Sequence, residues 1–177
     1  MPVIAQANED KGYRISAMSD RSDRGFISSD VSLQMVLHNS TGNKATRDLQ
    51  IKTLEVIDEN LGDKSIVIFS EPNDIAGTAL LSHAKILDAD DQWLYLPTLK
   101  RVKRISSKNK SGPFVGSEFA FEDFTALELN KYSHEWVEEQ ACAELKCDVI
   151  KRIPQYEFSG YKHLLVWIDQ NDHQVRK

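Results

Sequence analysis

Apolar and polar residues alternate along much of this chain, and a period of two is typical of β-strands that bury one face. In residues 29–39, apolar side chains occupy every second position from Val31 to Leu37. The pattern returns at Leu49 and Ile51, which alternate with polar neighbours. The strands predicted from such patterns are residues 29–39, 45–56, 65–70, 78–87, 92–97, 101–105, 130–140, 145–153 and 161–169.

Turn signals separate these segments. Turns are predicted, from clusters of Gly, Pro, Asn and Asp, at residues 39–43, 61–64, 71–77 and 88–91. A short helix is predicted at residues 8–18, with Gly25 as the breaker that follows it, and another within residues 118–129. Because no long helical pattern lies between the strands, the sequence predicts an antiparallel meander rather than alternating strands and helices.

The composition fits one soluble domain. The chain has 177 residues, of which 41% are hydrophobic and 28% charged, and these fractions are ordinary for a globular protein. Its formal net charge is −5, whereas a dedicated nucleic-acid binder is usually basic. No run of about 18 apolar residues is present, so no transmembrane helix is predicted.

The sequence contains no constellation that predicts catalysis. None of the five histidines belongs to a helix-borne metal pair, and His134 in HEW lacks the second histidine of a zinc protease. Ser117 in VGSEF lacks the second glycine of a nucleophile elbow. We therefore predict no catalytic residue, no metal site and no cofactor.

The two cysteines lie close together in the chain. Cys142 and Cys147 flank the four residues AELK between two predicted strands. A four-residue hairpin loop would place them opposite each other, at about 4.5 to 5.5 Å between Cα atoms, which a disulfide spans. Two free thiols and half of a metal site are the alternatives, although further metal ligands are missing nearby. The disulfide also requires an oxidising compartment.

A basic run follows the aromatic segment WLYLP. Six positive charges fall within eleven residues that contain no acid: Lys100, Arg101, Lys103, Arg104, Lys108 and Lys110. An anionic headgroup, a membrane surface or an acidic partner protein fits such a run. The alternative is a nucleic-acid-binding β-barrel, in which Trp93 and Tyr95 would stack on bases. Long basic side chains also often cover apolar surface without any recognition role.

A longer stretch around this run resembles a known family. Residues 90–124, DDQWLYLPTLKRVKRISSKNKSGPFVGSEFAFEDF, closely resemble the hallmark region of outer-membrane lipoprotein-sorting (LolA-like) proteins, in the branch associated with efflux-type transporters. The segments EPNDIAGTALL, residues 71–81, and LNKYSHEW, residues 129–136, resemble the same family. The similarity extends over residues 12–169.

The resemblance implies a mainly β fold: one strongly curved antiparallel sheet, an incomplete barrel, with short helices over its open side. It implies a non-enzymatic carrier in the periplasm of a Gram-negative bacterium, which holds lipid or lipoprotein acyl chains for transfer toward the outer membrane. An inner-membrane efflux-type transporter is an implied partner. The resemblance also strengthens the disulfide.

The resemblance bears on both ends of the chain. Ala5-Gln6-Ala7 fits the small-x-small pattern of a signal-peptidase site. Residues 1–7 are therefore expected to be a signal-peptide remnant, and residues 8–177 to be one carrier domain. Relatives continue for several more strands after the segment that ends this sequence. Two interpretations therefore remain, a C-terminal truncation and a shorter sheet.

The strand pattern supplies candidates for the acyl-binding cavity, but an ordinary filled core would show the same pattern. Of Trp93 and Leu94, only one can point inward. The candidates are Val31, Leu33, Met35, Leu37, Leu49, Ile51, Trp93 and Leu94. The six residues of the basic run are the candidates for contact with a headgroup or a partner.

Overall fold

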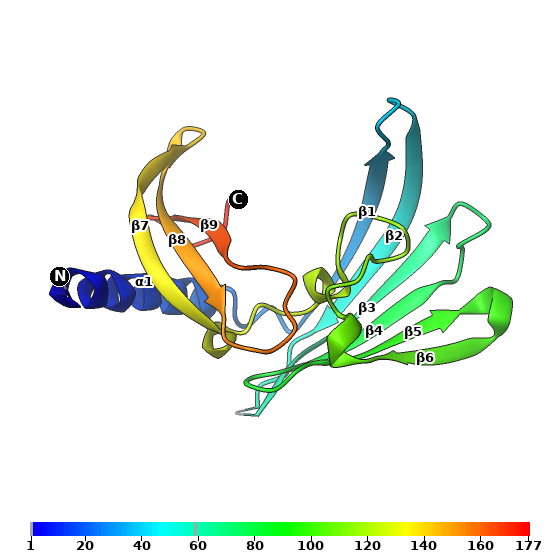
Figure 1. Cartoon of the computed structure of the whole chain (residues 1–177), viewed down its shortest axis with the longest axis horizontal. Helices are drawn as coiled ribbons and strands as arrows, with labels where there is room; N and C mark the ends of the chain where they lie inside the picture. The colour runs from blue at the N-terminus through cyan, green and yellow to red at the C-terminus, as the bar shows by residue number, and fades with distance from the viewer. Residues whose placement is uncertain (1, 59) are drawn as a thin grey trace. The chain divides into compact units, whose positions relative to one another are not determined.

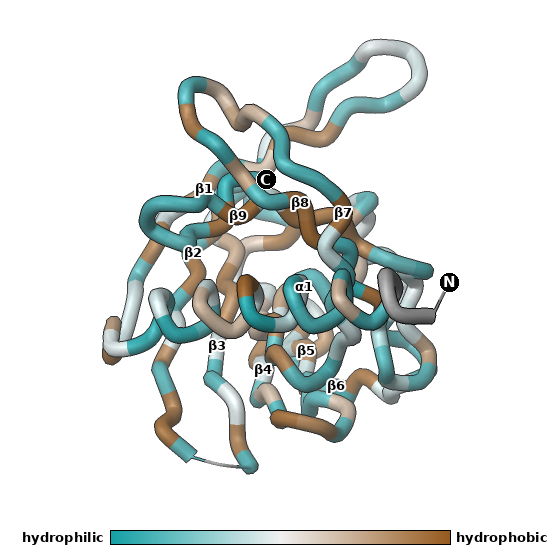
Figure 2. The backbone as a smooth tube through the Cα atoms, turned by 90° about the vertical axis from the view of Figure 1, so that its left-hand side faces the viewer, coloured by the Kyte–Doolittle hydropathy of each residue, from teal (hydrophilic) through white to brown (hydrophobic). Residues whose placement is uncertain are grey.

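The computed structural model describes residues 2–58 and 60–177, with side chains from residue 6 onward. In these residues one long helix, α1 (Pro2–Ser22), is followed by nine strands and several short 3₁₀ turns (Figure 1). Hydrophilic residues dominate α1 (Figure 2). No helix in the described ranges is long and apolar enough to cross a membrane.

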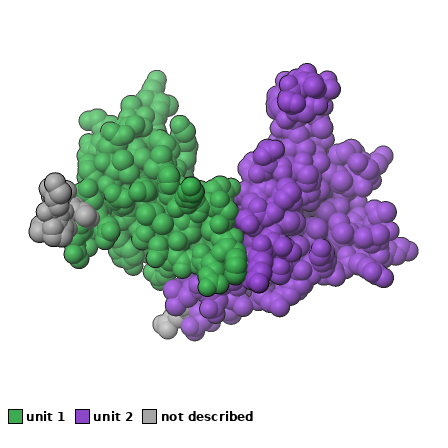
Figure 3. Space-filling model, viewed as in Figure 1, with its two compact units in different colours: residues 1–25, 127–177 green, residues 26–126 purple. Residues whose placement is uncertain are grey.

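The chain divides into two compact units, coloured green and purple in Figure 3. The first unit consists of residues 1–25 and 127–177, and the second of residues 26–126. The chain therefore leaves the first unit after its helix and returns to complete it. A single carrier domain over residues 8–177, preceded by a signal-peptide remnant whose first residue lies outside the described part, stays a prediction.

The second unit is built on a six-stranded antiparallel meander, in which each strand pairs with its neighbours in the chain. Its strands are β1 (Ser28–His38), β2 (Lys44–Leu54), β3 (Leu61–Glu71), β4 (Ala79–Lys85), β5 (Asp91–Leu96) and β6 (Arg101–Ile105). The first unit holds a separate three-stranded sheet. The prediction of a mainly β, antiparallel fold is confirmed, but its strands form two sheets instead of one. An incomplete barrel stays a prediction.

The turn between β1 and β2 fixes the register of that hairpin. The Asn39 side-chain oxygen accepts hydrogen bonds from the backbone N–H groups of Thr41 and Asn43, at 3.0 and 2.8 Å. Gly42 takes a φ of +83°, which costs glycine least. The strands then stay in one register from Ser28 opposite Leu54 to His38 opposite Lys44, so each strand keeps its apolar set on one side.

The turn predicted at residues 61–64 is wrong, because these residues open strand β3. The reversal lies earlier, where the Asp58 carboxylate accepts hydrogen bonds from the backbone of Asn60 and Leu61, at 2.7 and 3.1 Å. Asp63 caps the other side of the reversal by accepting from the Val56 N–H at 2.9 Å. Aspartate bonds of this kind favour turns, but the Gly-Asp pair in the strand gave the stronger sequence signal.

One face of the six-stranded sheet is apolar. Residues opposite each other in antiparallel strands share a face, and the register places Val31, Ile51, Val67, Leu80 and Leu94 in one row. We call the side of the sheet that carries this row the apolar face. Its larger apolar residues on β1 to β5 are Val31, Leu33, Met35, Leu37, Leu49, Ile51, Val67, Phe69, Leu80, Leu94 and Leu96, and Ile105 of β6 lies on the same side.

The loop after β6, residues 106–126, covers the middle of the apolar face, and we call it the covering loop. Phe114 is fully buried there, with ring centroids 5.6 Å from Phe69, 5.5 Å from Phe121 and 4.2 Å from Phe124. The helix predicted within residues 118–129 is reduced to the 3₁₀ turn Phe121–Phe124, followed by a second such turn at Leu129–Lys131. The loop therefore acts through its aromatic side chains rather than as a regular helix.

In the first unit, α1 packs on the sheet of β7 (Tyr132–Cys142), β8 (Leu145–Pro154) and β9 (Leu164–Asp169). Ile15 of the helix is buried with Ile150, Val166 and Ile168 of the strands. Gly12 lies so close to β7 that a Cβ atom at this position would be 2.6 Å from the backbone nitrogen of Trp136. The helix is longer than predicted, and its backbone includes residues 5–7.

A buried polar pair lies in the same unit. His134 and Arg152 are opposite each other on β7 and β8, and both are buried. His134 Nε2 is 2.9 Å from the Leu129 carbonyl oxygen, which can only accept, so Nε2 carries the proton. Burial lowers the pKa of His134, and burial also lowers the pKa of Arg152. The imidazole is therefore neutral near pH 7, next to the guanidinium charge.

Cys142 and Cys147 form a disulfide, with 5.9 Å between their Cα atoms. The connecting loop is shorter than the predicted four residues, because Cys142 itself pairs with Leu145. Ala143 takes a φ of 56° in this tight turn. The cysteines are therefore diagonal neighbours on the hairpin rather than direct opposites, and Cys147 stands opposite Gln140.

We expect that protein made in an oxidising compartment will show no free thiol when it is denatured without reductant. Replacing both Cys142 and Cys147 by serine should lower the free energy of unfolding by about 2 kcal/mol, because the closed loop is short. Thiol labelling with mass spectrometry and chemical denaturation measure the two effects. Quantitative labelling of two thiols in the unreduced protein would contradict the disulfide.

Candidate functional site

The structure brings nearly all the predicted cavity residues onto the apolar face. Leu49 belongs to the buried core beneath the covering loop, and Met35, Ile51 and Leu94 pack against that core. Trp93 points the other way, because its neighbour Leu94 takes the inward position. The Trp93 ring instead meets His83 edge-on, with 5.2 Å between centroids.

The apolar face has a covered part and an uncovered part. On the central strands the covering loop buries Leu49, Val67, Phe69 and Leu80, which are at most 3% exposed. Along the edge strand β1 the same face stays open, and Val31 and Leu33 are 45% and 46% exposed. Filled core and accessible apolar surface are therefore adjacent on one sheet.

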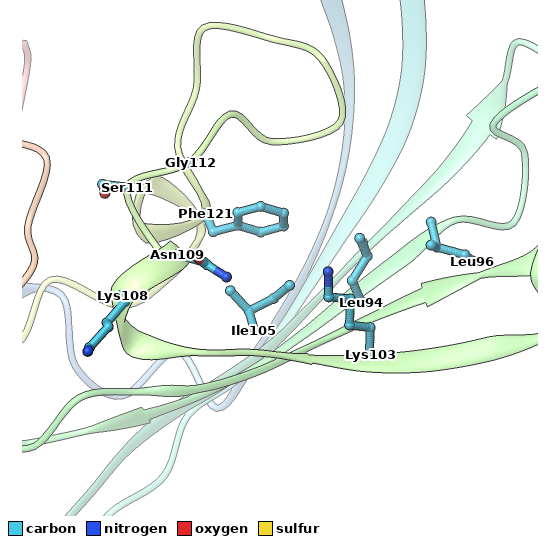
Figure 4. A pocket seen from close by; sticks show the side chains of 9 residues that line it. All are labelled: Leu94, Leu96, Lys103, Ile105, Lys108, Asn109, Ser111, Gly112 and Phe121. Atoms are coloured by element: carbon cyan, nitrogen blue, oxygen red, sulfur yellow. The ribbon is translucent and has the colours of Figure 1, made fainter.

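A partly open pocket of about 430 Å³ lies over the other end of the apolar face, on β5 and β6. Its lining, shown in Figure 4, combines strand residues with residues of the loop that follows β6. The lining residues are Leu94, Leu96, Lys103, Ile105, Lys108, Asn109, Ser111, Gly112 and Phe121.

The six residues of the basic run, which were the candidates for contact with a headgroup or a partner, do not share one exposed edge. Lys110 is only 7% exposed, and its ammonium donates a hydrogen bond to the Asp90 carbonyl oxygen. That prediction is therefore wrong for Lys110. Along β6 the strand alternation divides the other residues, since Lys103 stands opposite Leu94 and Arg104 opposite Trp93.

Arg104 belongs to an ion-pair cluster on the opposite side from the apolar face. It pairs with Asp91, and Lys85 Nζ lies 2.9 Å from the same carboxylate. The hydrogen bonds from Arg104 and Lys85 hold the pKa of Asp91 below its ordinary value. The exposed residues of the run include Lys100, Arg101, Lys103 and Lys108. Every second residue of β6, namely Arg101, Lys103 and Ile105, lies on the side of the sheet that carries the pocket.

Arg47 is a site residue that the sequence analysis missed. Its guanidinium donates a hydrogen bond to the Val115 carbonyl oxygen and thereby ties the covering loop to β2. Next to it, Gly116 takes a φ of +69°. The available signal was the alternation itself, because Arg47 occupies an inward position two residues before Leu49 and four before Ile51.

The fold and the site define a class of protein with an antiparallel sheet whose apolar face is closed in part by an aromatic loop. The chain is 43% identical to an outer membrane lipoprotein-sorting protein domain from Vibrio parahaemolyticus, with a TM-score of 0.89, and the match covers 95% of this chain and 70% of that chain. A family model described as an uncharacterized protein matches residues 62–177. The chain therefore belongs to the outer-membrane lipoprotein-sorting protein family.

Two less similar structures share the fold. A DUF1329 family protein from Desulfovibrio piger is 22% identical, with a TM-score of 0.85, and the match covers 95% of this chain and 71% of that chain. A LolA superfamily protein from Nitrosomonas europaea is 17% identical, with a TM-score of 0.65 and coverages of 93% and 68%. No curated protein matches the chain at a significant level.

Proposed function

We propose that this protein carries lipids or lipoproteins by binding their acyl chains on the apolar face. Family membership supports a role in lipid or lipoprotein transfer, and we place it in the periplasm, with delivery toward the outer membrane. An inner-membrane efflux-type transporter is the partner that we expect to load it. No catalytic step is part of this proposal.

The observation that carries the proposal is the half-exposed apolar edge at Val31 and Leu33. Leaving these apolar side chains in water adds nothing to the stability of the folded protein. A bound acyl chain would cover them and exclude that water. Burying each methylene of an acyl chain contributes about 0.8 kcal/mol. A chain laid along β1 would therefore bind usefully even after the cost of ordering it.

The covering loop is the part of this unit that we expect to respond to ligand. Its backbone runs over the apolar face from Gly112 to Phe124, and the Arg47 hydrogen bond to Val115 holds it to β2. Releasing that bond would free the part of the loop around Val115, while the buried Phe114 and the hydrogen bond from Gln92 to the Phe121 carbonyl keep the rest of the loop on the sheet. We propose that Arg47 holds the loop closed in the absence of cargo.

The basic run gives little support to the nucleic-acid alternative. Trp93 and Arg104 lie on the opposite side from Lys103, and Arg104 is already paired with Asp91. The candidate stacking residue Trp93 and the Lys103 ammonium therefore do not share one groove, which single-strand binding requires.

We expect Leu33→Asp to reduce binding of a fluorescent acyl probe by at least tenfold while the protein stays folded. Leu33 is already 46% exposed, so the new carboxylate keeps its water, but it places a charge where the acyl chain would lie. Val36→Asp is the matched control, because Val36 is 44% exposed on the other side of the same strand. Probe titration and circular dichroism measure binding and folding.

The two variants also test which side of β1 meets the ligand. Equal loss of binding in both would show that the edge strand acts as a whole, and loss only in Val36→Asp would show that the cargo uses the opposite side. Mass spectrometry of lipids extracted from the purified protein should find acyl chains in the wild type and a reduced amount in Leu33→Asp. Lipid-free wild-type protein that binds no acyl probe would overturn the proposal.

A further inference from the structure

We propose that the pocket over β5 and β6 selects amphiphiles with an anionic headgroup, through the ammonium of Lys103. This inference rests on the proposed function, because it assumes that an acyl chain occupies the apolar face. It concerns a different question, namely which chemical class of cargo the protein prefers. A lipid with one or two acyl chains would be preferred if its headgroup carried a carboxylate or a phosphate.

The walls of the pocket suit the apolar part of such a ligand. Leu94 and Leu96 come from β5, Ile105 from β6, and Phe121 from the covering loop. Leu94 and Phe121 also pack against the buried core of the unit. The pocket is therefore an extension of the apolar face rather than an isolated surface hollow.

The charge in the pocket is of one sign. In Figure 4 the Lys103 ammonium extends between Ile105 and Leu94, on the inner side of the pocket, whereas the Lys108 ammonium points away from it. Among the described residues, no acidic side chain lines the pocket. No ion pair joins Lys103 to an acid within residues 2–58 and 60–177.

Asp91, the acidic residue of β5, is unavailable to Lys103. Asp91 lies one position from Gln92 on β5 and is paired with Lys85 and Arg104 on the opposite side of the sheet. Arg101 stands on the same side as Lys103, opposite Leu96. Strand β5 thus pairs its one acid, Asp91, with two cations on one side of the sheet, and β6 leaves Arg101 and Lys103 beside leucines on the other.

An ammonium among leucine and isoleucine side chains favours an anion for two reasons. Water is partly excluded by the apolar walls, so the attraction is stronger than at an open surface. A charge-assisted hydrogen bond to a carboxylate or phosphate oxygen is also stronger than one to a neutral group. A neutral acylglyceryl group, such as a lipid-modified peptide carries, would gain neither, and a cationic headgroup would be repelled.

The test is competition for a bound fluorescent acyl probe on the full chain, with ligands of one chain length used below their micelle concentrations. The ligands are dodecanoate, dodecyl phosphate, monolauroylglycerol and dodecyltrimethylammonium. We expect the two anions to bind the wild-type protein about tenfold more tightly than the neutral glyceride, and the cation to bind most weakly. Raising the salt concentration should narrow the difference between anions and the neutral glyceride, because the Lys103 side chain is exposed.

Variants of Lys103 assign the preference to its charge. Lys103→Met keeps an unbranched stem of similar length, so it should bind the neutral glyceride as the wild type does and lose the preference for anions. Lys103→Arg should retain that preference. Lys44→Met is the matched control, because Lys44 lies on the same six-stranded sheet with its side chain on the opposite side, and it should behave as the wild type.

The outcomes separate this inference from the proposed function. If no ligand displaces the probe, or the wild-type protein never binds it, the proposed function fails. If all four ligands compete equally, or Lys103→Met keeps the anion preference, the inference fails while the carrier function stands. Equal weakening of every ligand in Lys103→Met would likewise overturn it. A preference for dodecyl phosphate over dodecanoate would identify a phosphate-bearing lipid, and the reverse a free fatty acid.

Discussion

Replacing Phe114 by alanine is expected to lower the free energy of unfolding of the six-stranded unit by about 3–5 kcal/mol. Phe114 is fully buried and meets three other phenylalanine rings, Phe69 on β3 and Phe121 and Phe124 in the covering loop. Its removal leaves a cavity between loop and sheet and takes away three aromatic contacts, of which the contact with Phe121 is edge-to-face. Chemical denaturation followed by Trp93 fluorescence measures the loss.

Phe119→Ala is the matched control, because Phe119 belongs to the same loop but is 50% exposed. Its loss should be smaller by at least 2 kcal/mol, because less apolar surface is buried and no cavity forms. Hydrogen exchange should show faster exchange over residues 106–126 in Phe114→Ala. Equal destabilisation by the two substitutions would mean that Phe114 does not anchor the loop.

Replacing Gly12 by alanine is expected to destabilise the first unit by about 1–3 kcal/mol. In an isolated helix the same change stabilises by roughly 1 kcal/mol, because alanine is the better helix former. Here the new Cβ would lie 2.6 Å from the backbone nitrogen of Trp136 and 2.7 Å from the backbone carbonyl oxygen of His134. Backbone atoms of a paired strand can shift only slightly, because their positions are fixed by the hydrogen bonds of the sheet. The helix must therefore move away from β7.

The sign of the effect is the decisive measurement for Gly12. Asp10→Ala, on the exposed side of the same helix, raises helix propensity without touching β7, and it should leave stability unchanged or slightly higher. Trp136 fluorescence during denaturation and hydrogen exchange over residues 6–22 report on the docking of the helix. A Gly12→Ala protein more stable than the wild type would show that α1 does not pack on β7 as described.

The strands were predictable from the sequence because burial of one face imposes a period of two. The alternation around Val31 and Leu49 placed both strands and also grouped the residues of the apolar face correctly. It left Trp93 and Leu94 undecided, since both are apolar and only the register shows which of them points inward. The family resemblance supplied the carrier hypothesis, which periodicity alone does not contain.

The helix was predicted only in part, as a short helix at residues 8–18, and its full length from Pro2 to Ser22 was missed for a physical reason. The buried positions on the contact side of α1 include Gly12, Ser16 and Ser19 beside Ile15. Small residues allow the close approach to the strands, but they do not produce the apolar period by which helices are recognised. The hydrogen bond from Arg47 to Val115 was equally hidden, because it joins positions 68 residues apart.

The division of the chain into units has a consequence for the order of folding. Residues 26–126 form one unit from a continuous stretch of chain, and its meander pairs only neighbouring strands. The helix, by contrast, needs partners that are made more than a hundred residues later, as in the contact of Tyr13 with His134. Local pairings form faster than distant ones, and domains made early during synthesis fold first. When the chain emerges N-terminus first, α1 must therefore wait, with Ile15 not yet packed, until β7 and β8 emerge, and a folded meander shortens the loop that this late docking has to close.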